Sequence, residues 1–439
     1  MKSKKIVIYI ATFVASLLGL WLLLIVTSMI PNDAIADKLE QSALTYQDKE
    51  GYQLSESGRL NEIEDNYADA ILLNVLWNID SNNPVISSLD TKYYDGESTG
   101  EGYGLYAAVH GAQPNTDYSR YWHGSVVLLR PLLLFLDVNG IKLVGFGVIL
   151  LLLAVNCMLL VREKLSFMAV GLIVSLLGVQ IWNVRLSLEY MPAFLIALAL
   201  CPCFLWMERK GNVYVKVLCI IGGVMTAFFD FLTTETVTLL LPLILVMAVR
   251  ASKGRLGKRR ENMLLLLQSG LLWAASYGMT FLVKWTAVTA ATGQNKFLTA
   301  VTSAEKRMYG SVETEQMSGI GQVLCAIPAN LSTLFGGTVR VDGTRVVVGL
   351  LLTVLVVFCV YYLFRTEHKN REITWILLIL GLVPYLRFLV LNNHSYLHEF
   401  FSYRAQCAAI LSLWAIVSFQ IELPFGKSRS KSRNKSRRK

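Results

Sequence analysis

Residues 6–30 read IVIYIATFVASLLGLWLLLIVTSMI, an apolar run that follows three lysines near the N-terminus. A helix of about 20 apolar residues is long enough to cross the ~30 Å hydrocarbon core of a membrane. The run is much longer than the ~7–15-residue core of a signal peptide, so we expect a retained membrane anchor. Further apolar runs lie at 140–161, 165–184, 188–207, 214–231, 234–249, 263–283, 344–364, 372–391 and 403–421. Together they predict about ten transmembrane helices.

The composition agrees with a membrane protein. Of 439 residues, 54% are hydrophobic and 16% charged, whereas soluble proteins carry about 25% charged residues. The short alternating segments of a β-barrel are absent, so the sequence predicts an all-α polytopic membrane protein. The seven cysteines lie mostly in apolar runs without C-x-x-C spacing, which indicates packing residues rather than disulfides or a metal site.

The distribution of basic residues orients the chain. Of 41 lysines and arginines, 25 fall in short segments that share one side when the N-terminus is inside, so we expect both termini to be cytoplasmic. The net charge of +10 comes mainly from these segments and indicates lipid contact rather than nucleic-acid binding. The expected organisation is a first helix (1–30), an extracytoplasmic loop (31–137), helices two to seven (138–290), a second extracytoplasmic segment (291–342), helices eight to ten (343–422) and a basic cytoplasmic tail (423–439).

The first loop carries 17 acidic and 6 basic residues, together with two stretches that favour helix. RLNEIEDNYADAILLNVLWNID (59–80) places apolar residues at helical spacing from Leu60 to Trp77, which predicts a helix packed on other structure. GSVVLLRPLLLFLD (124–137) is too short to span a membrane and predicts an interfacial or re-entrant helix. His123, Arg130 and Asp137 would share one face of it if the helix continued through Pro131.

Ionisable residues gather at the predicted outer ends of the spans. Such groups are costly at the membrane and usually have a partner or a function. Arg185 and Glu189 could pair with each other at i,i+4 spacing, and Asp230 could cap a helix that starts near Thr233. The others are Glu235, Lys284, Arg387, His394, His398, Glu399 and Arg404.

Simple structural roles remain open for some of these residues. His394 and His398 have the spacing of a metal pair but no third ligand nearby, so they could instead be interfacial or bind phosphate. His123 and Arg130 could be no more than the polar face of an amphipathic helix. We expect no metal centre, although a divalent ion remains possible.

Taken together, these groups favour a site for a lipid-linked phosphate. Arginine binds phosphate oxygens with two hydrogen bonds, and a loop carboxylate can remove a proton from an attacking hydroxyl. Asp69 is the first candidate for this base because its helical stripe runs into apolar residues, and Asp65 and Glu64 are the alternatives. The candidate substrate-binding residues are His123, Arg130, Arg185, Glu189, Asp230, Glu235, His394, His398 and Arg404.

In these features the chain resembles the GT-C superfamily of polytopic membrane glycosyltransferases. The resemblance lies in the long first loop, its carboxylates EIEDNYAD, the stretch YWHGSVVLLRPLLLFLD and the basic, aromatic turn NHSYLHEFFSYR (393–404). It implies transfer of a sugar from a polyprenyl-phosphate donor to an envelope glycan or lipid, on the outer face of a bacterial plasma membrane. It also implies that the acid or base lies in the first loop and that NHSYLHEFFSYR binds the donor phosphate.

Two other classes of function remain. A transporter or flippase for an envelope lipid should show helix-breaking pairs in related halves, but Pro192, Pro242 and Pro384 form no symmetric pattern. A polymerase, ligase or acyltransferase could use a similar outer site, although such enzymes often place their large outer loop late in the chain.

Overall fold

The computed structural model describes residues 2–96, 100–298, 300–302, 319–337 and 371–420, together with Val354 and Val357. Within these residues, seven helices are long and apolar enough to cross a membrane: Lys4–Ser28, Val138–Arg162, Leu188–Lys210, Asn212–Phe229, Arg259–Thr292, Arg371–Val390 and Glu399–Gln420. Shorter apolar helices occupy Ser166–Gly178, Val237–Ser252 and Val323–Leu334. The chain is therefore a multi-pass, mainly helical membrane protein, as its composition predicts.

The predicted runs and the observed helices differ in length. The run at 165–184 gives only α8 (Ser166–Gly178), because Gln180 takes a left-handed conformation with φ of 50° and a 3-10 turn, η3 (Ile181–Leu186), follows. The run at 234–249 becomes α11 (Val237–Ser252), which is also too short to count as a long span. Apart from Val354 and Val357, the predicted span 344–364 lies outside the described residues, and so does the basic tail 423–439.

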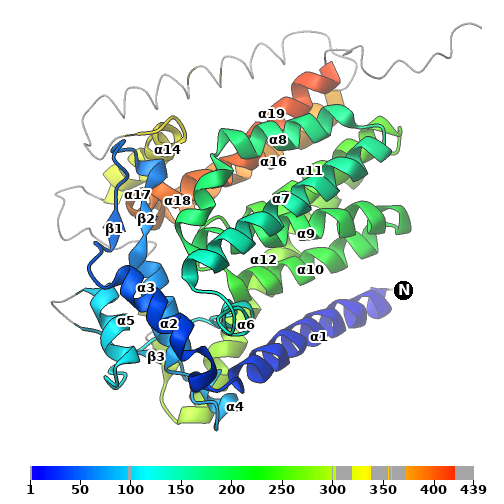
Figure 1. The fold of residues 1–439 in the computed structure, drawn as a ribbon. Helices are drawn as coiled ribbons and strands as arrows, with labels where there is room; N and C mark the ends of the chain where they lie inside the picture. Colours follow the sequence, from blue (N-terminus) through cyan, green and yellow to red (C-terminus); the bar gives the residue numbers. More distant parts are fainter. Residues whose placement is uncertain are drawn as a thin grey trace, which may run out of the picture.

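The membrane helices form a bundle whose long axes run roughly together (Figure 1). α1 (Lys2–Ser28) lies at its edge and exposes many apolar side chains, as expected for a helix facing lipid. The other members are α7 (Val138–Arg162), α8, α9 (Pro192–Met207), α10 (Asn212–Phe229), α11, α12 (Arg259–Thr292), α16 (Arg371–Val390) and α19 (Cys407–Gln420). The shorter α14 (Gly319–Leu334) lies at one end of the bundle.

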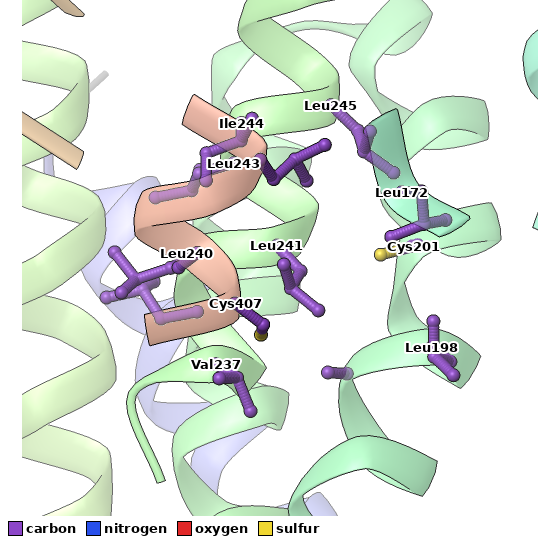
Figure 2. Close-up of a cluster of buried hydrophobic side chains, with 14 of the residues drawn as sticks. Leu172, Leu198, Cys201, Val237, Leu240, Leu241, Leu243, Ile244, Leu245 and Cys407 are labelled. Carbon is purple, nitrogen blue, oxygen red and sulfur yellow. The ribbon is translucent and has the colours of Figure 1, made fainter. Parts of the chain in front are cut away.

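The centre of the bundle surrounds α11. Leu240, Leu241, Ile244 and Leu245 are all almost completely buried, and Figure 2 shows them packed with α8, α9 and α19. Lipid is as apolar as leucine, so membrane helices associate mainly through close packing rather than through removal of apolar surface from water. The buried thiols of Cys201, Cys219 and Cys407 pack here, and all six described cysteines are free.

A glycine permits the closest approach between two of these helices. A Cβ at Gly223 of α10 would lie only 2.3 Å from the carbonyl oxygen of Trp273 and 2.2 Å from Oγ of Ser276, both on α12. No side chain fits at that distance, so the α10–α12 contact requires glycine at this position.

Residues 31–137 form a layer of short elements at one end of the bundle (Figure 1). The helices are α2 (Asn32–Tyr46), η1 (Leu60–Glu62), α3 (Asn66–Trp77), α4 (Pro84–Ser87), α5 (Glu101–Val109) and α6 (Val126–Leu132). Two antiparallel pairs join β1 (Tyr52–Gln53) to β2 (Glu64–Asp65) and β3 (Lys92–Tyr93) to β4 (Thr116–Asp117). This layer is packed structure rather than a free linker, and its buried apolar residues form one cluster with residues of the bundle such as Leu24, Phe228 and Val288.

Trp122 and Lys284 dock this layer on the bundle. The ring of Trp122 stacks on Phe228 of α10, and its Nε1 donates to the Thr280 carbonyl of α12 at 2.9 Å. Lys284 of α12 donates through Nζ to the carbonyls of Ser88 and Leu89, at 3.0 and 2.7 Å. These contacts give Lys284 a structural role.

Two expectations for this layer are wrong. The helix predicted to include Leu60 begins only at Asn66, because residues 60–65 form η1 and β2. The predicted face of His123, Arg130 and Asp137 does not exist, because α6 ends at Leu132, one residue after Pro131. His123 lies before α6 with φ of 53°, and Asp137 instead caps α7 through the Gly140 amide.

Candidate functional site

Two of the predicted carboxylates, Asp65 and Asp69, lie one turn apart at the start of α3 but have different surroundings. Asp65 is the N-cap of this helix, and its Oδ1 accepts a hydrogen bond from the Ala68 amide at 2.9 Å. That bond satisfies one of the free amides at the helix start and fixes where α3 begins. Asp69 lies one turn later, in the interior of the protein.

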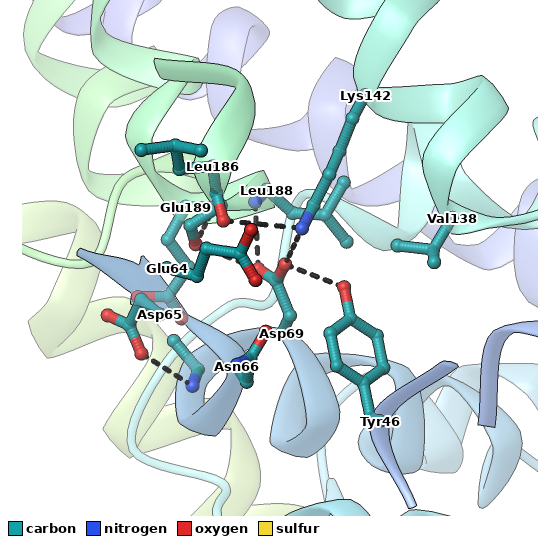
Figure 3. Close-up of polar contacts among 12 residues, drawn as sticks. Tyr46, Glu64, Asp65, Asn66, Asp69, Val138, Lys142, Leu186, Leu188 and Glu189 are labelled. Atoms are coloured by element: carbon teal, nitrogen blue, oxygen red, sulfur yellow. Dashed lines mark hydrogen bonds and ion pairs between the residues drawn. The ribbon is translucent and has the colours of Figure 1, made fainter. Parts of the chain in front are cut away.

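Asp69 is held by four donors and has no exposed surface. Its Oδ1 accepts from the Ser187 hydroxyl at 2.8 Å and from the Leu188 amide at 2.7 Å. Its Oδ2 accepts from the Tyr46 hydroxyl at 2.9 Å and pairs with the Lys142 ammonium at 2.6 Å. Figure 3 shows how these partners converge on one carboxylate.

The partners of Asp69 come from three parts of the chain: α2, the start of α7, and the turns η3 and η4 (Leu188–Tyr190). The buried ion pair between Asp69 and Lys142 thus joins the 31–137 layer to the bundle. A carboxylate with four donors has little capacity left to accept a proton from a substrate. We therefore assign Asp69 a structural role.

Asp65 is buried but, among the described residues, accepts a single hydrogen bond. Burial raises the pKa of its carboxyl to about 7; the negative charge of Asp69 adds to the shift, and the Ala68 amide and Lys142 oppose it. A group with a pKa near the working pH can accept and release a proton efficiently, so Asp65 suits acid–base chemistry.

The segment before Asp65 contacts the late turns of the chain through Arg404. This residue belongs to η6 (Tyr403–Gln406), is 1% exposed and lies 4.5 Å above the Tyr190 ring. Its guanidinium donates to the carbonyls of Phe400 at 3.2 Å and Asn61 at 3.5 Å. Among the described residues it has no carboxylate partner, and its Nε donates no hydrogen bond.

Aromatic rings complete the junction between the two ends of the chain. Tyr52 is the cross-strand partner of Asp65, and its ring meets Phe400 of α18 (Glu399–Ser402) edge to face at 5.4 Å. The Tyr190 hydroxyl donates to the Ile63 carbonyl at 3.4 Å. We call the set Asp65, Tyr52, Tyr190, Phe400 and Arg404 the junction site.

The two predicted histidines lie beside this site, at α17 (Asn392–Leu397) and its C-cap. The rings of His394 and His398 are 4.8 Å apart, and that of His398 also stacks on Phe401 at 5.3 Å. Phe401 in turn contacts Tyr190 of the junction site at 5.9 Å. The histidines are therefore part of a continuous aromatic group rather than a lipid-facing belt.

Behind the histidines, a buried ion pair secures the turn between α10 and α11. Arg387 donates through Nε to Glu235 at 2.9 Å and through Nη2 to the Leu232 carbonyl at 2.6 Å, and it also contacts His394 at 3.4 Å. Leu232 has a φ of 68°, a strained conformation for this residue. Glu235 is thus paired with a cation rather than available to a substrate.

Asp230 opens the same turn and accepts from the backbone amide and the hydroxyl of Thr233, at 3.1 and 2.5 Å. The expected link between these two residues is present, although α11 begins four residues later, at Val237.

Arg130 and His123 do not belong to the junction site. Arg130 is fully buried and donates to the carbonyls of Leu76 and Ile30 and to the Asn32 side chain, which makes it a structural link between α6 and the layer. Burial lowers the pKa of His123 to about 3, so its ring is neutral at ordinary pH and is no counter-ion for phosphate. Their predicted role in substrate binding is therefore replaced by a structural one.

The remaining candidates, Glu64, Arg185 and Glu189, are all at least partly exposed to solvent. Glu64 is half-exposed and pairs with Lys49 at 2.9 Å. Arg185 is exposed at the end of η3, and Glu189 is half-buried in η4. The expected helical face of Arg185 and Glu189 is not formed, because Ser187 between them has extended backbone angles.

Sequence reasoning missed the partners of Asp69 and the tyrosines of the junction site. Lys142 had a detectable signal, since it is a lysine near the start of an apolar run and such residues usually have a partner. Tyr46, Ser187 and Tyr190 had none, because their importance depends on tertiary contacts: Tyr46 meets Asp69 from another helix, and Ser187 and Tyr190 meet residues more than 100 positions away.

No cofactor or metal enters this description. Within the described ranges, no group of three or more His, Cys, Asp or Glu side chains is arranged to hold a metal ion. Comparisons with protein-family models, curated proteins and solved structures gave no match for this chain. The function must therefore be argued from the site itself.

Proposed function

We propose that this protein is a membrane glycosyltransferase that moves a sugar from a polyprenyl-phosphate donor to a cell-envelope acceptor. The observation that carries the proposal is the junction site, in which a buried carboxylate with a raised pKa follows two residues after Ile63, whose carbonyl accepts from Tyr190, and the buried Arg404 lies over the ring of that tyrosine. A buried charge without a counter-ion costs several kcal/mol. A ligand phosphate would supply that counter-ion for Arg404.

The reaction is placed on the outer face of a bacterial plasma membrane. The basic residues favour an N-terminus and a C-terminus in the cytoplasm, which would put residues 31–137 and 393–404 outside together. Their contact through Asn61 and Arg404 agrees with this common side. A lipid-linked donor would then reach the site from the membrane, and the acceptor from the envelope.

In the proposed reaction, the Asp65 carboxylate removes the proton from an acceptor hydroxyl. The hydroxyl oxygen forms a bond to the anomeric carbon of the donor sugar, and the bond from that carbon to the phosphate oxygen breaks. The electron pair leaves with the polyprenyl phosphate, whose added negative charge Arg404 stabilises. Such preorganised positive charge in a site of low dielectric constant is an effective way to lower a barrier.

The histidines and the second arginine support this arrangement. His394 and His398 lie between the Arg387–Glu235 pair and the Phe401 ring, so their positions are fixed by contacts on both sides. In this proposal His398, whose ring lies 5.7 Å from that of Phe400, contacts the donor phosphate together with Arg404. Arg387 acts through His394 and is a positioning residue.

Purified protein in lipid nanodiscs, offered a panel of polyprenyl-phosphate sugars, tests the proposal. We expect release of polyprenyl phosphate with one donor, and a rate at least about 100-fold lower for Asp65→Asn, the typical loss of a general base. Asparagine is as good an N-cap as aspartate, so α3 should be preserved. Asp48→Asn, which alters an exposed carboxylate of the same layer, is the matched control.

Two outcomes would refute the proposal. One is the absence of transfer from every donor in the panel by well-folded wild-type protein. The other is full activity of Asp65→Asn, which would leave the junction site without its base.

A further inference from the structure

Two tyrosines of the 31–137 layer stack on each other and still keep broad surfaces in solvent. The rings of Tyr52 in β1 and Tyr67 in α3 have centroids 5.6 Å apart and planes inclined by 17°. Their side chains are nevertheless 42% and 36% exposed. Clustered aromatic surface that remains exposed commonly marks a binding face.

This pair adjoins the proposed base. Tyr52 is the cross-strand partner of Asp65, and the Tyr67 amide donates to the Gly51 carbonyl at 2.9 Å, which fixes α3 against the strand. The other edge of Tyr52 meets Phe400. A ligand lying on the two rings would therefore be next to the strand pair that carries Asp65.

Polar groups border the same rings. A Cβ placed on Gly51 would lie 3.4 Å from Cβ of Tyr67 and 3.7 Å from Oε2 of Glu101, so the glutamate is next to the ring pair. Burial and, after it, the charge of Glu101 raise the pKa of Tyr67 to about 12. Arg120 lies on the same side, stacked 4.4 Å above the Tyr118 ring.

Aromatic faces combined with carboxylates are suited to carbohydrate. The C–H groups of a sugar carry partial positive charge and pack on the negative face of an aromatic ring. Its hydroxyls donate hydrogen bonds to carboxylates such as Glu101. The 17 acidic and 6 basic residues of this layer would repel an anionic polymer.

We infer that Tyr52, Tyr67 and Glu101 form a binding face for the acceptor of the reaction, and that this acceptor is an uncharged carbohydrate chain. The inference rests on the proposed function, because it assigns the acceptor to the surface that leads to Asp65. It narrows the acceptor from any envelope polymer or lipid to a glycan without acidic groups.

Binding measurements that need no catalysis test this inference. Wild-type protein in nanodiscs is titrated calorimetrically with neutral oligosaccharides, such as chito- and malto-oligosaccharides, and with oligogalacturonate as the anionic counterpart. We expect the wild type to bind a neutral oligosaccharide and to bind the anionic one at least about tenfold more weakly. Tyr67→Ala should weaken neutral-sugar binding about tenfold, and Tyr67→Phe should retain most of it.

Tyr214→Ala is the matched control. Tyr214 is 45% exposed near the start of α10, whereas Phe228, near the end of that helix, packs on Gly124 of the layer. The control tyrosine therefore lies at the far end of the bundle and should leave binding unchanged. Glu101→Gln adds a second variant that keeps both rings, so a folding defect in Tyr67→Ala cannot decide the result alone.

The inference is overturned if the wild type binds none of the neutral oligosaccharides, if it prefers the anionic one, or if Tyr67→Ala and Glu101→Gln both bind like the wild type. Asp65→Asn separates this result from the proposed function, because it should bind the oligosaccharide normally while losing transfer. If Asp65→Asn loses transfer but still binds the oligosaccharide, the result supports both the proposed function and the acceptor face. If the wild type transfers sugar without binding to this face, only the acceptor face is refuted.

Discussion

Asp65, the N-cap of α3, and Asp69, one turn further along that helix, are both buried aspartates. Their hydrogen-bond partners nevertheless differ. Asp69 accepts from three hydrogen-bond donors and pairs with Lys142, whereas Asp65 accepts a single hydrogen bond from an amide. A fully paired buried carboxylate stabilises a contact between segments. A poorly paired one has a raised pKa and can take part in proton transfer. The comparison gives Asp69 a structural role and is the reason why Asp65 is the proposed base.

The largest expected effect comes from breaking the Asp69–Lys142 pair. Lys142→Met leaves the Asp69 carboxylate buried without its cation, which typically costs ~3–5 kcal/mol. Reversible unfolding in mixed micelles measures the loss. The double variant Asp69→Asn with Lys142→Met should be less destabilised than Lys142→Met alone, because no unpaired charge remains. A loss below about 1 kcal/mol for Lys142→Met would show that the pair does not hold the layer on the bundle.

The next largest effect is expected from substitutions of Arg404, the cation of the junction site. Arg404→Gln removes the cation proposed to meet the donor phosphate, and a hydrogen bond to a charged group contributes ~1.5–3 kcal/mol. The KM for the lipid donor should rise about 10- to 100-fold. Arg404→Lys should recover only part of this loss, since lysine keeps the charge without the planar pair of donors. An unchanged donor KM in both variants would separate Arg404 from substrate binding.

A smaller effect is expected on stability as the pH changes. An unfolded aspartate titrates near 3.8, but Asp65 has a pKa of about 7 when folded. Between these values the folded state binds more protons, so stability falls as the pH rises from about 4 to about 7. Asp65→Asn removes this loss and should gain on the order of 1–3 kcal/mol at pH 8, with no gain at pH 4. Equal effects at both pH values would mean that Asp65 titrates normally.

The smallest effect belongs to Glu64, the neighbour of Asp65 in β2. Its ion pair with Lys49 is about one-third exposed on each side, and exposed pairs contribute about 0–1 kcal/mol. Glu64→Gln should lower the free energy of unfolding by less than about 1 kcal/mol and change the transfer rate by less than about threefold. A rate loss as large as that of Asp65→Asn would move the base to the adjacent residue.

The helical membrane fold was predictable because it depends on local properties of the chain. Length and hydropathy identify runs such as 140–161, and the structure places α7 there. The turns between the spans were less predictable. α8 ends early because of the left-handed Gln180, and α6 ends after Pro131. These endings are set by single residues that hydropathy does not detect.

The sequence indicated which two segments of the chain would come together, but not the roles of the individual residues in them. The sequence indicated that carboxylates of the 60s and cations near 400 would meet, but the contact that the structure shows is from Arg404 to the backbone carbonyl of Asn61 and not to a carboxylate. It ranked Asp69 above Asp65 because apolar neighbours indicate burial, and both residues are in fact buried. Only the contacts with Lys142 and Ser187 distinguish them, and these depend on tertiary structure.

The most direct test is the pH dependence of the transfer rate. With Asp65 as the base and a pKa of about 7, the rate should rise about tenfold per pH unit below that value and level off above it. The residual rate of Asp65→Asn should be flat over the same range. A wild-type rate that is already constant from pH 5 upward, or an Asp65→Asn profile that keeps the rise, would contradict the account.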